Sequence, residues 1–254
     1  PRELSENGTI PAEALAFLSA LMQCDCSLLI AGNTASGKTT TLNALFSFIP
    51  GNERVIITEE TPEINLPHKH QMRLVANRDM GITLKDLVYD TLRMRPDRMV
   101  VGEVRNKEET EALFDVLLAG QARGSYATFH AQSAEEALSR LQSFGVRRED
   151  IGSIDCVVVQ RRMLMYDAER RKNSEVRRVV EIAGVENEGL QSIYRHGKPI
   201  RYGRLLDKMA ESFGLNREGM LDELKRRERV IMETQGDFSA FYKAVQKDFF
   251  GLEG

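Results

Sequence analysis

Residues 30–45 read IAGNTASGKTTTLNAL, and this stretch decides the fold. Its centre, from Gly32 to Thr39, fits the pattern G-x-x-x-x-G-K-[ST], which is typical of phosphate-binding loops. The apolar run SLLIAG before it predicts a short buried strand, and TTTLNALFSFIPG after it predicts a helix that ends by Pro50 and Gly51. A strand, a glycine-rich loop and a helix in this order indicate a P-loop that binds a nucleoside triphosphate with Mg²⁺.

The composition of this loop follows from the chemistry of triphosphate binding. Backbone N–H groups must wrap the phosphates, so the side chains have to be small and some backbone angles unusual. The phosphates then lie at the positive end of the following helix. Lys38 is expected to contact the β- and γ-phosphates, and Thr39 to offer its hydroxyl to Mg²⁺. The predicted nucleotide-binding residues are Gly32, Asn33, Thr34, Ala35, Ser36, Gly37, Lys38, Thr39 and Thr40.

The composition is that of a globular chain with a substantial core. Of the 254 residues, 42% are hydrophobic and 29% charged, and the formal net charge is −3. This balance gives no global basic field that would favour nucleic-acid binding. No apolar run approaches the ~18 to 20 residues that a bilayer-spanning helix needs. The odd set of Cys24, Cys26 and Cys156 favours a reducing compartment; Cys24 and Cys26 are either small buried hydrophobes or half of a metal site.

Strands and helices alternate from the P-loop to about residue 150, which predicts a mainly parallel sheet. Ser133 and Glu136 open the last of these helices with a capping-box pattern. The predicted strands are 54–60, 98–103 and 125–130. A first predicted helix covers 11–24, and a second is capped by Thr83 with Asp86. A third is capped by Asn106 and stopped by Gly120, and the last starts at Ser133.

The pattern changes after about residue 154. Two strand-like runs, DCVVVQRRMLMYD and EVRRVVEIAGVE, flank the polar AERRKNS and predict an antiparallel hairpin at about 155–185. After Gly203 the sequence becomes helical. An aromatic stripe there is either a core face or a docking face for a partner subunit; its residues are Phe238, Phe241, Tyr242, Val245 and Phe249. We therefore expect an α/β core over 1–203 and a C-terminal helical subdomain over 204–254.

Carboxylates end two of the predicted strands. Glu103 ends one, and Glu59 and Glu60 end another. Because the carboxyl ends of parallel strands converge on a ligand crevice, these three acids could surround one Mg²⁺ and one triphosphate. Glu103 would then hold Mg²⁺ through water or orient the attacking water. The alternative is that these are exposed glutamates at strand ends.

A histidine and several arginines lie near the same strand ends. His130 ends the strand 125–130 and is either a γ-phosphate contact or a structural histidine. Arg93, Arg95 and Arg105 flank the strand of Glu103. Arginine can pair with phosphate through two parallel hydrogen bonds, although such residues more often form surface salt bridges.

The order of these motifs resembles the type II/type IV secretion ATPase family, the hexameric motors of pilus assembly, type II secretion, conjugative transfer and archaeal surface filaments. Residues 59–63 (EETPE) resemble the acidic box of the family, with Glu60 in place of its Asp. Residues 102–105 (GEVR) resemble its Walker B motif, and residues 124–131 (GSYATFHA) resemble its histidine box. The run SGKTTTLNALFSFIP is most similar to the archaeal and tight-adherence branch.

This resemblance implies a RecA-like P-loop NTPase core that hydrolyses ATP with Mg²⁺. Thr39 and Glu103 would hold the metal, and the catalytic residues would be Glu103, Glu59, Glu60, His130, Arg105 and Arg93. It also implies a homo-oligomer, a hexameric ring in the full-length protein. The ring would be cytoplasmic and would bind a membrane platform protein peripherally, without direct nucleic-acid contact. In such proteins a separate N-terminal domain precedes this core; we expect it to be missing or cut off here, which agrees with a start at Pro1 rather than Met.

Three other functions remain possible from the residues. A P-loop nucleotide kinase would need an arginine-rich lid, which we do not find. A DNA-translocating or conjugative-type ATPase would need a basic surface, for which RRMLMYDAERRK is the candidate. A non-hydrolytic nucleotide-binding scaffold is the third, and the glutamate at position 103 argues against it.

Overall fold

The computed structural model describes residues 1–168, 171–186 and 189–252. Within these residues, eight strands form one sheet in the order β3-β2-β4-β5-β1-β6-β7-β8. Neighbouring strands from β3 to β6 in this order pair in parallel. β7 pairs antiparallel with β6 and with β8. The predicted α/β class with a mainly parallel sheet is therefore confirmed.

The strands of this sheet are β1 (Leu28–Gly32), β2 (Val55–Glu59), β3 (Gln71–Val75), β4 (Arg98–Val104), β5 (Gly124–Phe129), β6 (Cys156–Asp167), β7 (Lys172–Glu186) and β8 (Gly189–Arg195). The helices are α1 (Arg2–Glu6), α2 (Ala12–Gln23), α3 (Lys38–Leu45), α4 (Leu84–Thr91), α5 (Lys107–Ala119), α6 (Ala134–Ser143), α7 (Gly203–Phe213), α8 (Arg217–Glu233) and α9 (Phe238–Phe250).

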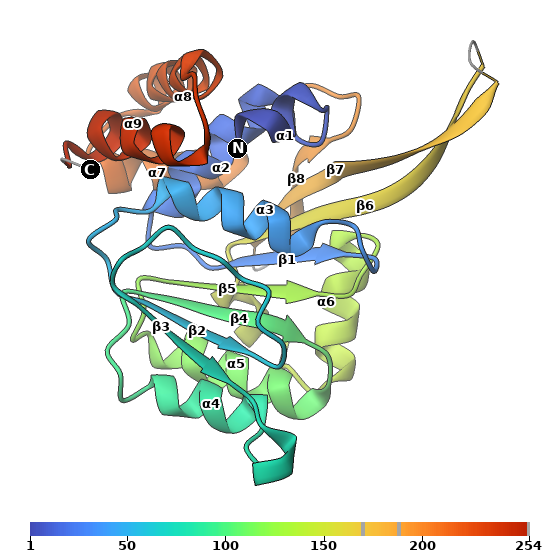
Figure 1. The fold of residues 1–254 in the computed structure, drawn as a ribbon, viewed down its shortest axis with the longest axis vertical. Coiled ribbons are helices and arrows are strands. Elements are labelled where there is room, and N and C mark those ends of the chain that lie inside the picture. Colours follow the sequence, from blue (N-terminus) through green and yellow to red (C-terminus); the bar gives the residue numbers. More distant parts are fainter. Residues whose placement is uncertain (169–170, 187–188, 253–254) are drawn as a thin grey trace.

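Helices cover both faces of the sheet, and each face has its own hydrophobic cluster. In β1, Leu28 and Ile30 join the cluster formed with α2, α3 and the C-terminal helices. Leu29 and Ala31 point the other way and join the cluster formed with α4, α5 and α6. Figure 1 shows these two helical layers and, between them, the sheet. Burial on both faces explains why β1 is an unbroken apolar run.

The residues predicted to cap and end helices do so, with one correction at α6. Thr83 and Asp86 form a complete capping box at α4, Asn106 caps α5, and Gly120 ends α5 in the left-handed conformation. Ser133 caps α6 through the N–H of Glu136, but the Glu136 carboxylate accepts from the N–H of Gln132 instead of closing the box. The capping box predicted at α6 is therefore only half formed.

The two edge strands of the sheet, β3 and β8, were not predicted from the sequence. β3 is exposed at most of its positions and mixes polar and apolar residues, so its sequence carries little periodic signal. β8 likewise alternates weakly and pairs only with β7 among the described residues. The predicted hairpin at 155–185 is confirmed as β6 and β7, which extend beyond the sheet as a long two-stranded arm (Figure 1).

The C-terminal helices pack on the α2 side of the sheet. In the predicted aromatic stripe, Phe241 and Val245 are buried in the cluster that also holds Phe48. Phe238 is 46% exposed and lies outside it. The stripe is thus mainly a core face, and the division at residues 203/204 stays a prediction. No helix among the described residues is long and apolar enough to cross a membrane.

The three cysteines are free thiols in buried positions. Cys24 and Cys26 flank the turn between α2 and β1, and Cys156 opens β6. All three belong to the hydrophobic cluster on the α2 side of the sheet. This placement agrees with small buried hydrophobes, the first of the two alternatives.

A buried ion pair links the first residue of β4 to the loop before β2, at the end of the strands opposite the P-loop. The guanidinium of Arg98, which is fully buried at the start of β4, contacts the Glu53 carboxylate with Nε and Oε2 2.5 Å apart. It also donates to the carbonyl of Cys24 and to the Tyr126 hydroxyl. These bonds satisfy an arginine that would otherwise be costly to bury.

Glu53→Ala should therefore lower the free energy of unfolding by about 3 to 5 kcal/mol, because it leaves the Arg98 charge buried without its carboxylate. The measurement is urea denaturation followed by circular dichroism. Glu111→Ala, which breaks an exposed pair with Lys107, is the control and should cost less than about 1 kcal/mol. Equal losses for the two variants would show that the buried pair is not a stability determinant.

Candidate nucleotide-binding site

Parallel pairing brings most of the predicted site residues together where the strands of the sheet end. The P-loop follows β1, Glu103 lies near the end of β4, and His130 directly follows β5. Because β5 pairs with both β1 and β4, these three strand ends are neighbours. The P-loop residues and the side chains of Glu103, Arg105 and His130 line one cavity of about 710 Å³. The predicted convergence is therefore observed within one chain.

The P-loop has the backbone that its sequence requires. Gly37 has φ +94° and immediately precedes α3, which leaves the first N–H groups of that helix facing the cavity. A Cβ on Gly32 would lie 2.2 Å from the carbonyl oxygen of Gln160 in β6, so only glycine fits there. The loop is thus shaped by its own glycines and by the neighbouring strand β6.

Glu103 is the centre of the charged groups in the cavity. Its Oε1 lies 3.4 Å from the Lys38 Nζ and 3.0 Å from the His130 Nε2. Its Oε2 accepts from the Arg105 Nε at 2.7 Å. One carboxylate therefore links the P-loop lysine, the histidine after β5 and the arginine after β4.

These contacts set the protonation states. Burial raises the pKa of Glu103, but the hydrogen bond from Arg105 and the charges of His130 and Lys38 outweigh it and hold this pKa below its ordinary value. Burial, together with the charge of Lys38, lowers the pKa of His130. At neutral pH His130 is therefore mainly neutral, with its Nε2 close to an oxygen of the ionised Glu103. Burial also lowers the pKa of Lys38, against the attraction of Glu103.

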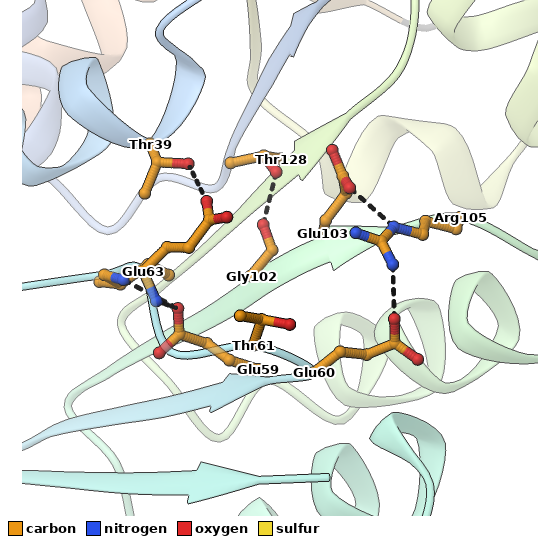
Figure 2. Close-up of a pocket in the computed structure, with 10 residues that line it drawn as sticks. Thr39, Glu59, Glu60, Thr61, Glu63, Gly102, Glu103, Arg105 and Thr128 are labelled. Carbon is orange, nitrogen blue, oxygen red and sulfur yellow. Dashed lines mark hydrogen bonds and ion pairs between the residues drawn. The ribbon is translucent and has the colours of Figure 1, made fainter. Parts of the chain in front are cut away.

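The predicted acids Glu59 and Glu60 have different surroundings (Figure 2). Glu60 accepts from Arg105 at 2.5 Å, so Arg105 bridges it to Glu103. Glu59 is 1% exposed, and its Oε1 accepts from the backbone N–H groups of Glu63 and Ile64 at 2.9 and 2.8 Å. Glu59 therefore anchors the loop that follows β2, and this loop carries Glu60 into the site.

Gly102 stands where many P-loop proteins have an aspartate, and the structure explains the glycine. A Cβ at this position would lie 3.1 Å from the Glu59 Cγ and 3.4 Å from the Thr58 carbonyl oxygen. The larger aspartate side chain would press on the buried Glu59. The approach of β2 to β4 at the site therefore favours glycine at position 102.

The oxygen groups near Thr39 suit Mg²⁺. The Thr39 hydroxyl donates to the Glu63 carboxylate at 3.3 Å, and both side chains line the cavity with Glu103. Mg²⁺ prefers oxygen ligands and is usually held by one or two side chains together with phosphates and water. In the described residues, no group of three or more His, Cys, Asp or Glu side chains could hold a metal. Thr39 and Glu103 fit the predicted role beside a bound phosphate chain.

Arg93 does not join this group in its own chain. It is exposed and precedes the first residue of β4, whereas Glu103 lies near the last residue of that strand. Its predicted catalytic role could only be exercised on another subunit. The remaining predicted residue, Arg105, lies in the site as described above.

Two site residues, Gln160 and Arg177, were not predicted because they come from the β6–β7 arm. The Arg177 Nε donates to the carbonyl of Ala35 in the P-loop at 2.9 Å. The buried Gln160 accepts from the Thr41 hydroxyl at 2.7 Å. No spacing relative to the P-loop marks these residues, because only the sheet order places β6 beside β1.

The fold and the site define a P-loop nucleotide-binding protein. Residues 1–203 match the family described as Type II/IV secretion system protein. The chain belongs to this family, as its motifs predicted. The particular branch stays a prediction.

Individual relatives agree with this assignment. The uncharacterized protein MJ1287 of Methanocaldococcus jannaschii is 29% identical over 262 residues, which is 96% of each chain. The type IV secretion system protein VirB11 of Bartonella quintana is 33% identical over 56% of this chain and 40% of its own length. The crystal structure of the VirB11 ATPase from the Brucella suis type IV secretion system superposes with a TM-score of 0.55 at 27% identity, covering 71% of this chain and 53% of that chain. The chain thus spans about half the length of these VirB11 proteins.

The pKa of His130 provides a test of the site electrostatics. Its NMR titration midpoint should lie below about 6.5, the ordinary value for histidine, because burial and Lys38 oppose protonation. Lys38→Met should raise this midpoint, and Glu103→Gln should lower it further. The folded pKa of His130 lies below the unfolded one. The stability that His130 contributes is therefore fully present above pH ~6.5 and is lost as the pH falls from there through the folded pKa.

The His130 signal can be assigned from its disappearance in His130→Gln. If the midpoint were insensitive to both substitutions, the three side chains would not form the cluster described here.

Proposed function

We propose that this protein is an ATP-hydrolysing motor of a type II secretion, type IV pilus-like or archaeal surface-filament machine. The observation that carries the proposal is the arrangement of Lys38, Glu103 and His130 around one cavity beside the P-loop. Membership in the secretion ATPase family supports it. The motor would work at the cytoplasmic face of the membrane and act on a membrane platform protein.

Each side chain has a role that its geometry supports. Lys38 and the P-loop N–H groups bind the β- and γ-phosphates. Glu103 is ionised, so it can orient a water and accept its proton. His130 contacts the Glu103 carboxylate with its Nε2 and would sense the γ-phosphate. Thr39 and Glu103 would hold Mg²⁺, which would neutralise negative charge on the phosphates.

The acids after β2 and Arg105 complete this proposal. Arg105 bridges Glu60 and Glu103, which places a guanidinium at the mouth of the site. Such a group can stabilise charge that develops on the transferred phosphoryl group. Glu59 acts through the loop that it anchors. The Glu60 carboxylate takes the place of the family's aspartate, and its ion pair with Arg105 supports a similar role.

The charges on the arm support this motor over the DNA-translocating alternative. Arg162 and Arg177 both pair with Glu175, and Arg178 contacts His196. The single carboxylate of Glu175 offsets part of the positive charge of Arg162, which belongs to the stretch RRMLMYDAERRK, and of Arg177. We therefore expect DNA to leave turnover unchanged.

Glu103→Gln should retain MgATP binding and lower phosphate release by about 10²- to 10⁴-fold, because it removes the group that activates water. Phosphate release is measured over a range of protein concentrations. Glu108→Gln, an exposed glutamate in the first turn of α5, is the control and should match the wild type. If Glu103→Gln also matched the wild type, Glu103 would not be the catalytic carboxylate.

The same assay tests ring formation. The wild-type activity per molecule should rise with protein concentration, because a ring places each site between two subunits.

Arg93 can be tested by mixing two inactive variants. We expect Arg93→Ala to lower turnover by roughly 10³-fold if it reaches the site of the next subunit. Mixing it with Glu103→Gln should restore activity, because some interfaces then combine an intact Glu103 with an intact Arg93. The control mixture pairs Arg93→Ala with Lys38→Ala,Arg93→Ala, which has no intact Arg93. An absence of recovery in the first mixture would remove Arg93 from the catalytic residues.

A further inference from the structure

The β6–β7 arm rests on the P-loop through three polar contacts. The Asn33 side chain pairs with both backbone groups of Arg162, accepting from its N–H at 3.0 Å and donating to its carbonyl at 3.3 Å. Gln160 accepts from Thr41 at the first turns of α3. Arg177 donates to the carbonyl of Ala35. The base of the arm is therefore fixed to the P-loop at Asn33 and Ala35 and to α3 at Thr41.

Arg177 lies at the same end of α3 as the predicted phosphates. Its Cδ is 3.5 Å from the position that a Cβ on Gly37 would occupy, and Gly37 is the N-cap of α3. Ala35, whose carbonyl it contacts, has φ +58°, an uncommon angle for a residue other than glycine. Arg177 lines the same cavity as Lys38. A phosphate held by the N–H groups of Gly37 and Lys38 would lie within reach of its guanidinium.

The charges around the cavity distinguish Arg177 from the other cations. Lys38 is paired with Glu103, and Arg105 is paired with Glu103 and Glu60. Among the described residues, the carboxylate that pairs with Arg177 is that of Glu175, at 2.8 Å, which lies on the arm outside the cavity lining. The positive charge of Arg177 is thus not opposed by an acid of the site itself.

We propose that Arg177 is a phosphate-binding residue of the nucleotide site, delivered from the arm within the same chain. This inference rests on the proposed function, since it assumes that the cavity binds ATP. The guanidinium exchanges its contact with Glu175 for phosphate oxygens, to which it can donate two parallel hydrogen bonds. Because the arm carries Arg177, phosphate binding also determines how the base of the arm rests on the P-loop.

The test is the affinity for MgATPγS, measured by calorimetry with the complete chain. Arg177→Ala should weaken binding by roughly 10- to 100-fold, because it removes a charge-assisted hydrogen bond. The matched control is Arg178→Ala, which removes the same charge from the next residue of β7, where the side chain contacts His196 instead. This control should bind as the wild type does.

A second variant separates phosphate binding from support of the loop. Arg177→Gln keeps an N–H donor for the Ala35 carbonyl and loses the charge, so it should weaken binding nearly as much as Arg177→Ala. Wild-type affinity in Arg177→Gln, or equal affinities for Arg177→Ala and Arg178→Ala, would overturn the inference and leave the proposed function standing. A wild type that binds MgATPγS no better than Lys38→Ala does would overturn the proposed function, and this inference with it.

Discussion

Parallel hydrogen bonding of β1 to β5 on one side and to β6 on the other is the constraint on which the site depends. The first pairing places the P-loop beside His130 and, one strand further, beside Glu103. The second places it beside the arm, so that the Gln160 carbonyl closes on Gly32 and leaves no room for a side chain. β1 is paired along both edges and buried by helices on both faces, so its register and its direction fix where the loop after it begins.

The elements that could be predicted are those whose signals are local. The apolar run of β1, the glycines of the P-loop and the caps at Thr83 and Asn106 act within a few residues, and all of them form as expected. β3 and β8 could not be predicted in the same way. They are edge strands, and pairing with the neighbouring strand, more than their own periodicity, stabilises them.

The same distinction holds for the site. Glu103 and His130 lie at the carboxyl ends of β4 and β5, and the convergence of parallel strand ends was enough to bring them together. Arg93 has a similar place in the sequence, but it precedes β4 instead of following it, and so it lies at the other edge of the sheet. Arg177 lies far from the P-loop in sequence, and no pattern linked it to phosphate. Its place depends on the register of β7 against β6, which only the folded structure defines.

The arm has a mechanical consequence. From Gln160 to Asp167 the strand β6 rises by about 24 Å at ~3.4 Å per residue, and β7 pairs with it along this length. A rotation of about 5° at the P-loop would therefore displace the far end by roughly 2 Å, as simple leverage on a rod of strand-like rise requires. Leu164 and Tyr166 are 74% and 65% exposed in this outer part. Through the length of the hairpin, a small angular change at the P-loop would become a larger linear displacement of these exposed apolar side chains.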